Sequence, residues 1–203
     1  MNAIDAAAVI LAGGRSSRFG SDKALASLHG ELVLTALCKR LLSQLPAVAV
    51  VSKAPSPYAT LLPASIINVA DSVMGTNPLI GIVSGLEWSP ADALLVAACD
   101  MPFAGMPVMV SRLWSALEGN AAAAFSWRGR PEPLCAFYRR TCLVTARVLA
   151  AAGRGPRHLL EAVQARIVPY EQAFPDDVDG LPFLDLDTPE DLARAAALRV
   201  TPS

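Results

Sequence analysis

Three glycines, two arginines and a lysine follow the first apolar run of the chain, in the stretch LAGGRSSRFGSDKAL from Leu11 to Leu25. Charged residues and turn glycines contribute little to a hydrophobic core. After a parallel strand, a Gly-Gly turn lets the backbone approach a ligand closely and leaves successive N–H groups free to hold phosphate oxygens. The stretch therefore predicts a phosphate-binding loop. The alternative is a glycine turn that carries solvated basic residues.

Two familiar phosphate-binding loops do not fit this spacing. A Walker A loop needs Gly-Lys followed by Ser or Thr, whereas here Gly20 is followed by Ser-Asp-Lys. A Rossmann fingerprint needs G-x-G-x-x-G, which GGRSSRFG does not supply. The order G-G-x-S-x-R-x-G-x-x-K is nevertheless too particular for a simple turn, so we interpret it as a phosphate-binding loop of another kind.

Two aspartates follow apolar runs that we expect to be strands. Asp100 ends the run ADALLVAACD, and Asp71 follows the run SIINVA. In open α/β sheets, ligands bind beyond the carboxyl ends of the strands, so Asp100 and the glycine loop should face one another. A carboxylate opposite a phosphate cradle suits Mg²⁺, which is usually held by one or two carboxylates plus substrate phosphates. The alternative for both aspartates is a plain turn residue.

Alternating strands and helices must position these residues. Periodicity predicts strands at 7–11, 47–51, 65–70, 93–98, 121–127, 133–138, 166–170 and 183–186, and helices at 32–45, 79–88, 107–117, 141–151 and 156–164. Thr188-Pro189-Glu190-Asp191 offers an N-cap, a proline at the first helical position and acids in the first turn of a last helix. This alternation predicts an α/β three-layer fold with a mostly parallel central sheet. Because no linker or repeat divides residues 1–203, we expect a single domain.

Composition excludes several other classes of protein. Hydrophobic residues make up 53% of the 203 residues, but no run approaches the length of a membrane span. The N-terminus carries Asp5 and lacks the basic region of a signal peptide. The four cysteines form no C-x-x-C pair and only two histidines are present, which argues against a zinc site or a disulfide framework. We therefore expect a cytoplasmic protein with reduced thiols.

Charge is distributed unevenly along the chain. The net charge of −1 gives no reason to expect a nucleic-acid partner. Between Arg128 and Arg166 there are eight arginines and two glutamates, whereas Glu171 to Asp191 holds eight acidic residues and no basic one. Two solvated faces of opposite sign would explain the pattern. Equally, the arginine-rich segment could receive an anionic small molecule, because guanidinium groups match phosphate geometry.

The opening stretch resembles the signature of the nucleotidyltransferase superfamily, and most of all that of the molybdenum cofactor guanylyltransferases. The Asp22-Lys23 pair is typical of that branch. The resemblance continues through Asp71, GTNPLIGIVSGL (75–86), ACDMPF (98–103), RPEPLCAFYRR (130–140) and LDTPEDLA (186–193). It implies a Rossmann-like nucleotidyltransferase fold and an enzyme that transfers GMP from Mg-GTP to molybdopterin-bound molybdenum, with release of pyrophosphate.

The resemblance also implies roles for particular residues. Nucleotide-binding groups would be Leu11, Ala12, Gly13, Gly14, Lys23, Asp71 and Asp100; catalytic groups would be Arg18, Lys23 and Asp100. Of these, Arg18 and Lys23 would hold the triphosphate and the leaving pyrophosphate, and Asp100 would bind Mg²⁺. Candidates for the phosphate and ring of the pterin are Arg128, Arg130, Arg154 and Arg157. Because the acceptor phosphate is already a nucleophile, catalysis would rest on alignment and charge neutralisation.

Four positions depart from the family pattern. Ser52 stands where most members have Asn, and Asn77 replaces the glycine of G-P-L-A-G. Asp185 and Asp187 replace two asparagines, as in the cytidylyltransferases that act on the same cofactor. The alternatives are therefore a transferase that uses CTP or a sugar-phosphate acceptor, and a non-catalytic cofactor carrier.

Arg18, Lys23 and Asp100 taken together favour an enzyme over a carrier, because a carrier needs neither a metal site nor a site for pyrophosphate. Further expected partners are cofactor-insertion chaperones or molybdoenzymes. We expect no nucleic-acid or membrane partner. The expected oligomeric state is a monomer or a weak oligomer.

Overall fold

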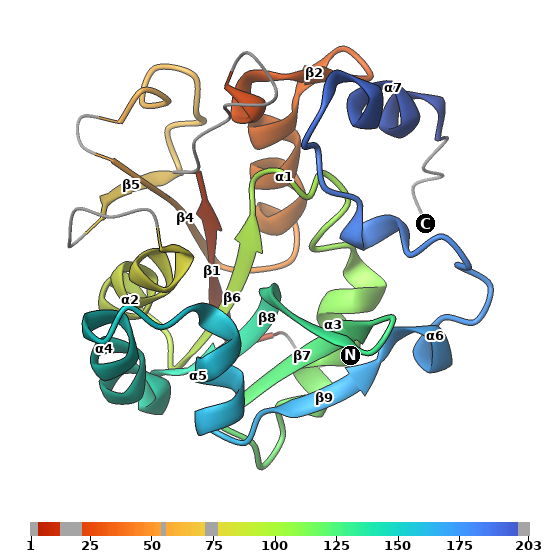
Figure 1. The fold of residues 1–203 in the computed structure, drawn as a ribbon. Coiled ribbons are helices and arrows are strands. Elements are labelled where there is room, and N and C mark those ends of the chain that lie inside the picture. The colour runs from red at the N-terminus through yellow and green to blue at the C-terminus, as the bar shows by residue number, and fades with distance from the viewer. Residues whose placement is uncertain (1–3, 13–21, 54–55, 72–76, 199–203) are drawn as a thin grey trace.

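A central sheet with helices on both faces organises the chain (Figure 1). The computed structural model describes residues 4–12, 22–53, 56–71 and 77–198. Within these residues, seven strands form one sheet in the order β5-β4-β1-β6-β8-β7-β9. They are β1 (Ala6–Leu11), β4 (Ala47–Ser52), β5 (Ile67–Ala70), β6 (Ala93–Ala98), β7 (Ala122–Trp127), β8 (Arg130–Arg139) and β9 (Arg166–Pro169). All neighbours pair in parallel except β8, which is antiparallel to β6 and β7, so the expected α/β fold is confirmed.

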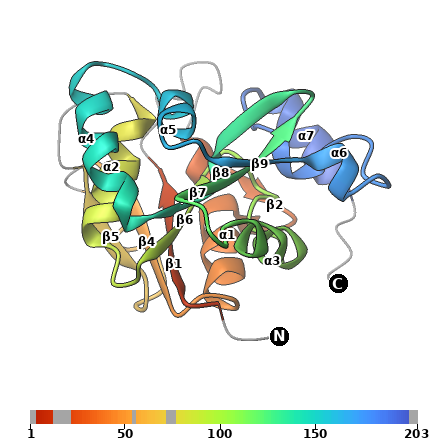
Figure 2. The ribbon, with the colours of Figure 1, turned by 90° about the horizontal axis from the view of Figure 1, so that it is seen from below.

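The helices divide between the two faces of the sheet (Figure 2). Residues of α1 and α3 pack on one face, and residues of α2, α4 and α5 pack on the other. The helices are α1 (Val33–Leu42), α2 (Pro78–Trp88), α3 (Pro107–Ala116), α4 (Leu143–Ala151), α5 (Pro156–Ala162), α6 (Tyr170–Ala173) and α7 (Pro189–Ala197). Single 3₁₀ turns are η1 (Lys23–Leu25), η2 (Arg140–Cys142) and η3 (Leu181–Phe183), and β2 (Ser27–Leu28) and β3 (Glu31–Leu32) form a separate hairpin.

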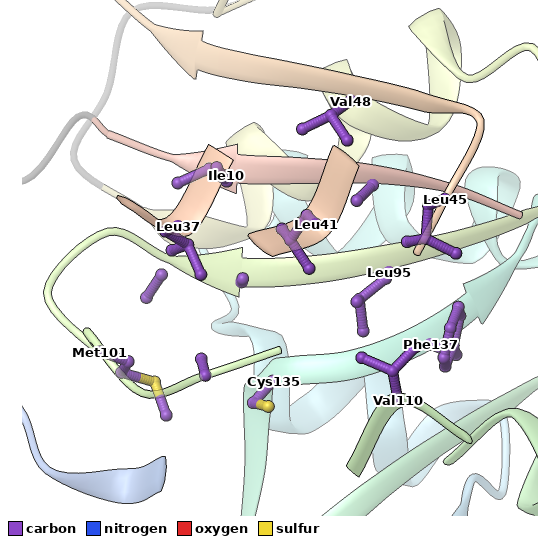
Figure 3. Close-up of a cluster of buried hydrophobic side chains, with 14 of the residues drawn as sticks. Ile10, Leu37, Leu41, Leu45, Val48, Leu95, Met101, Val110, Cys135 and Phe137 are labelled. Carbon is purple, nitrogen blue, oxygen red and sulfur yellow. The ribbon is translucent and has the colours of Figure 1, made fainter. Parts of the chain in front are cut away.

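The core forms because the central strands are apolar on both faces. Figure 3 shows Ile10 of β1 and Leu95 of β6 facing Leu37 and Leu41 of α1. On the opposite face α2 approaches β1 closely, since a Cβ added at Gly85 would lie only 2.8 Å from Cγ2 of Val9. The covering helices thereby fix the strands, and with them the strand ends that carry the polar residues.

The carboxyl ends of β1, β4, β5 and β6 meet at one edge of the sheet (Figure 1). Backbone hydrogen bonds continue past the strands: the Ala12 amide donates to Val51 (2.9 Å), and the Cys99 amide donates to Leu11 (3.1 Å). The Asp71 amide likewise donates to Ser52 (3.0 Å). Parallel pairing thus brings the start of the glycine loop and the residues that follow β5 and β6 to a common edge, as predicted.

The strand expected at 183–186 is wrong. Leu181–Phe183 is a 3₁₀ turn, and residues 184–187 are irregular. Leu184 and Leu186 pack with Phe103 and Val33 in a separate apolar cluster instead of extending the sheet. The last helix does begin at Pro189, and Thr188 and Asp191 form a reciprocal capping box at its start.

Two further expectations concern the thiols, which were expected to be reduced, and the lack of a membrane span. All four cysteines are free: Cys38, Cys135 and Cys142 are buried and Cys99 is half-buried. In the part of the chain that the structure describes, no helix has both the length and the apolar character needed to cross a membrane.

Candidate active site

The glycine loop begins at the carboxyl end of β1. Its predicted residues Gly13, Gly14 and Arg18 lie outside the described residues. The Ala12 amide and the Leu11 carbonyl are both engaged in hydrogen bonds with neighbouring strands. These two groups therefore anchor the start of the loop to the sheet. Nucleotide binding by Leu11, Ala12, Gly13 and Gly14 stays a prediction.

Lys23 is held in a short turn and reaches two carboxylates. Asp22 caps the turn η1, because its Oδ1 accepts from the Ala24 amide at 3.0 Å. The Lys23 side chain is only 13% exposed, and its Nζ lies 3.5 Å from Oδ2 of Asp100 and donates to Oδ1 of Asp187. Desolvation lowers the pKa of Lys23, but the hydrogen bond and charge of Asp187 and the charge of Asp100 outweigh it, so the pKa lies above the usual value. Lys23 and Asp100, which we expected at one site, therefore lie together, and Asp187 joins them; their roles stay predictions.

Several acidic groups converge on the end of β6. The Leu186 amide donates to the Asp100 carbonyl at 2.8 Å, which brings the flanking Asp185 and Asp187 to this edge. Desolvation, followed by repulsion from Asp100, Glu132 and Asp187, raises the pKa of Asp185 to about 7. Desolvation also raises the pKa of Glu132, although its Oε1 accepts from the Leu134 amide at 3.0 Å. The site is thus rich in negative charge, as a site for a cation should be.

The donor set fits a magnesium ion that arrives with a nucleotide. In the described ranges, no group of three or more His, Cys, Asp or Glu side chains is arranged to hold a metal by itself. Mg²⁺ rarely uses such an all-protein cage and is bound through one or two carboxylates, waters and substrate phosphates. One oxygen of Asp100 and one of Asp187 pair with the ammonium of Lys23, so these two carboxylates lie close enough together to bind the same cation.

Asp71 presents an unused acceptor at the same edge. Its buried Oδ1 has no hydrogen-bond partner among the described residues. Desolvation raises the pKa of Asp71, although the charge of Lys53 opposes the shift. Neighbouring α2 carries Gly81, where an added Cβ would lie 3.7 Å from that oxygen and 3.0 Å from Cδ2 of Leu11. A buried carboxylate oxygen without a partner suits a ligand that supplies a hydroxyl or ring N–H.

Asn77, one of the four unusual positions, is engaged at both ends of its amide. Its Oδ1 accepts from the Leu79 amide at 3.0 Å and caps α2. Its Nδ2 donates to the Arg154 carbonyl at 2.6 Å, which ties the start of α2 to the connection between α4 and α5. The side chain is therefore committed to the protein. Ser52, at the end of β4, is buried, and its carbonyl accepts from the Asp71 amide.

The four arginine candidates come from two places. Arg128 and Arg130 belong to the β7–β8 hairpin, where the Arg128 guanidinium lies 5.1 Å from the ring centroid of Trp127. Arg154 and Arg157 lie at and just beyond the α4–α5 connection, and the charge of Arg157 partly opposes the rise that desolvation causes in the pKa of Glu132. Arg154 and Arg157 thus adjoin Asn77 and Glu132, whereas no described contact assigns any of the four to a pterin.

Two residues near the site were missed by reasoning from sequence. Glu132 lies in the matching segment RPEP but was given no role. Tyr58, in a turn-rich stretch without a recognisable motif, donates from its hydroxyl to Oδ2 of Asp22 at 2.7 Å. No spacing rule connects these positions, because the chain folds back between them.

Comparison with known proteins agrees with this geometry. Residues 8–167 match the family described as the MobA-like NTP transferase domain. Over 196 residues the chain is 36% identical to the molybdenum cofactor guanylyltransferase of Cereibacter sphaeroides, which covers 94% of this chain and 95% of that protein. A probable molybdenum cofactor guanylyltransferase of Nostoc sp. is 33% identical over 192 residues, which cover 92% of this chain and 88% of that protein.

A solved structure resembles the whole fold. The crystal structure of molybdopterin-guanine dinucleotide biosynthesis protein A from Archaeoglobus fulgidus superposes with a TM-score of 0.78 at 25% sequence identity. The match covers 94% of this chain and 96% of that one.

Proposed function

The chain belongs to the MobA-like NTP transferase domain family, and on this basis we propose that it transfers GMP from Mg-GTP to the molybdopterin form of the molybdenum cofactor. It is a nucleotidyltransferase, and its relatives carry the guanylyltransferase name. The observation that carries the proposal is the meeting of Lys23, Asp100 and Asp187 at the carboxyl edge of the sheet.

The reaction is an in-line displacement at phosphorus. A phosphate oxygen of the acceptor attacks the α-phosphorus of GTP, the bond from that phosphorus to the bridging oxygen of the β-phosphate breaks, and pyrophosphate leaves. No protein nucleophile is needed, because the acceptor oxygen already carries the electron pair. The protein must therefore align the two substrates and neutralise the charge that grows on the leaving group.

Lys23 and the carboxylates divide this work. Asp100 and Asp187 would hold Mg²⁺, which supplies charge neutralisation for the phosphates when it is bound. Lys23 would turn its ammonium from these carboxylates to the pyrophosphate, where it offsets the developing negative charge. Arg18 would act beside it on the triphosphate. The capped turn at Lys23 supports this role, since it fixes the backbone from which the side chain reaches.

Asp71 would receive the nucleoside. The buried Oδ1 of Asp71, which has no hydrogen-bond partner in the part of the chain that the structure describes, can accept from a ribose hydroxyl or from a guanine N–H. Arginines near the site, Arg154 and Arg157, would attract the phosphate of the acceptor, with Arg128 and Arg130 at the hairpin as further candidates. With the nucleoside at Asp71 and the acceptor phosphate at the arginines, the α-phosphorus of GTP would lie between the two substrates.

Guanine is the base that we propose for the donor. Guanine offers an N1–H and N2–H₂ donor pair beside an O6 acceptor, which neither cytosine nor adenine reproduces. Asn77 does not oppose this preference, because both ends of its amide are already bonded to the protein. Buried groups left unpaired by the wrong base cost about 1–3 kcal/mol each, so two of them give at least about tenfold discrimination.

A titration tests the nucleotide assignment. Isothermal titration with Mg²⁺ and each of GTP, CTP and ATP is expected to give the tightest binding for GTP. Tighter binding of CTP would replace the guanylyl proposal by a cytidylyl one, a possibility that the acidic pair Asp185 and Asp187 raises. Tight cofactor binding without any triphosphate binding would instead indicate a carrier.

A further inference from the structure

Tyr58 is a buried aromatic residue whose hydroxyl faces the turn of the catalytic lysine. The residue is only 4% exposed and belongs to the same apolar cluster as Ala24. The hydroxyl donates to Oδ2 of Asp22 at 2.7 Å. Desolvation and the Asp22 carboxylate raise the pKa of Tyr58, so the hydroxyl keeps its proton and remains a donor. A hydrogen bond to an ionised acceptor of this kind is stronger than one between neutral groups.

Asp22 uses its second oxygen on the turn itself. Oδ1 accepts from the Ala24 amide at 3.0 Å, and the turn η1 begins at Lys23. One carboxylate therefore joins Tyr58 to the backbone that carries Lys23. A carboxylate held by a single hydrogen bond can rotate, whereas one held at both oxygens has a fixed plane.

The segment around Tyr58 is itself fixed to the sheet. The Tyr58 amide donates to Oγ of Ser56 at 3.3 Å, and Ser56 donates from that Oγ to Oδ1 of Asn68 at 2.8 Å. Asn68 belongs to β5, in register with Val50 of β4. A continuous chain of hydrogen bonds thus runs from the sheet through Tyr58 and Asp22 to the turn at Lys23.

We propose that Tyr58 is a positioning residue for nucleotidyl transfer, whose hydroxyl fixes Asp22 and thereby the turn that presents Lys23 to Asp100 and Asp187. The inference rests on the proposed function, because it assumes that Lys23 acts on the leaving pyrophosphate. Tyr58 would act through Asp22 and not by itself. Its effect should appear in turnover, since misplacing the ammonium weakens an interaction that is strongest in the transition state.

The test compares Tyr58→Phe with the wild-type protein in steady-state transfer assays. Phe keeps the buried ring and removes only the hydroxyl. We expect kcat to fall about ten- to a hundredfold, as for a displaced catalytic group, with a smaller change in KM for the nucleotide. In a Lys23→Ala background the same substitution is expected to have little further effect, because its consequence passes through Lys23.

Tyr170→Phe is a matched control. The Tyr170 hydroxyl also donates to an aspartate, Oδ2 of Asp177, at 2.7 Å. That aspartate accepts from the amides of Gly180 and Leu181 and so fixes a different turn. We expect Tyr170→Phe to keep the wild-type kcat while Tyr58→Phe loses activity. That difference would assign the effect to the turn at Lys23 and not to the loss of a tyrosine–aspartate hydrogen bond in general.

Three results would overturn the inference: an unchanged kcat in Tyr58→Phe, an equal loss in the Lys23→Ala background, or an equal loss in Tyr170→Phe. If Tyr58→Phe does not fold, Asp22→Asn takes its place, because Asn still caps a turn but no longer offers two carboxylate oxygens. Every assay uses the triphosphate that the wild-type protein accepts. Failure with GTP therefore counts against the proposed nucleotide, and loss or retention of kcat in the variants counts for or against Tyr58.

Discussion

The backbone N–H of Leu186 donates to the backbone carbonyl of Asp100 at 2.8 Å, and this bond places a C-terminal segment at the end of the central strand β6. Asp185 and Asp187 flank Leu186, so both carboxylates come to the edge where Asp100 and Lys23 lie. Part of the acidic C-terminal stretch therefore lies at the candidate site and does not belong to a purely solvated face.

Asp100→Asn is expected to abolish transfer while the protein stays folded. The amide keeps the size of the side chain but removes the charge that Mg²⁺ requires. Assays at limiting Mg²⁺ and a titration with Mn²⁺ in the presence of nucleotide measure the loss. Asp92→Asn is the control, because Asp92 precedes the same strand at its other end and pairs with Arg139. Near-normal activity of Asp100→Asn at limiting Mg²⁺ would contradict the metal assignment.

Lys23→Ala should lower kcat more than it weakens GTP binding. Removing one preorganised group that meets growing charge costs on the order of 10²–10³ in rate. Steady-state kinetics separate the two effects, with Lys39→Ala as the control because Lys39 is exposed and pairs only with Glu31 among the described ion pairs. A raised KM with unchanged kcat would show that Lys23 binds the ground state and the transition state equally.

The raised pKa of Asp185 predicts a dependence of stability on pH. Its carboxyl group has a pKa of about 7 in the folded protein and an ordinary value of 3.8. Between these values the folded state binds more protons than the unfolded state, so the free energy of unfolding should fall as the pH rises through this window. Asp185→Asn is expected to flatten that part of the profile.

Urea denaturation in the presence of a chelator, at several pH values from about 4 to about 8, measures this slope. Asp176→Asn is the control, because Asp176 is an exposed member of the same acidic stretch. The same slope in wild type and Asp185→Asn would mean that other groups set the pH dependence.

Thr188→Ala should destabilise the fold by about 1 kcal/mol. Oγ1 of Thr188 accepts from the Asp191 amide at 3.2 Å, and Oδ2 of Asp191 accepts from the Thr188 and Asp187 amides. The box therefore secures both α7 and the backbone of a site residue. Ser111→Ala, which removes a solvent-exposed hydrogen bond from a half-buried residue of α3, is expected to stay within about 0.5 kcal/mol of wild type. Equal stabilities of Thr188→Ala and Ser111→Ala in denaturation would contradict the prediction.

Local patterns were enough to predict most of the fold and the position of Asp100 at the carboxyl edge of the sheet. The runs at 7–11 and 93–98 are apolar without a break, which is typical of central parallel strands. Because parallel strands end at one edge of a sheet, Asp100 comes to the edge at which the glycine loop begins. The sequence FLDLD (183–187) misled because it alternates like a strand. The two leucines of this segment pack on Phe103 and not on the sheet. An alternating pattern is the same whether the apolar side chains pack on a sheet or on another apolar cluster.

Contacts between distant parts of the chain could not be predicted. Tyr58 and Asp22 meet only because β4 and β1 lie side by side, and a hydroxyl–carboxylate bond has no characteristic spacing. Asn77 departs from the family pattern, and the sequence does not show what its side chain contacts. In the folded structure its amide is hydrogen-bonded to the backbone of Leu79 and of Arg154.

Product analysis tests the central claim most directly. The purified protein is incubated with Mg²⁺, the molybdenum cofactor and either GTP or CTP, and the products are separated and identified by mass. We predict that the GTP reaction yields one pyrophosphate for each cofactor molecule that gains a GMP unit, and that the CTP reaction yields little product. A cofactor that gains CMP instead, or one that gains no nucleotide under either condition, would contradict the account.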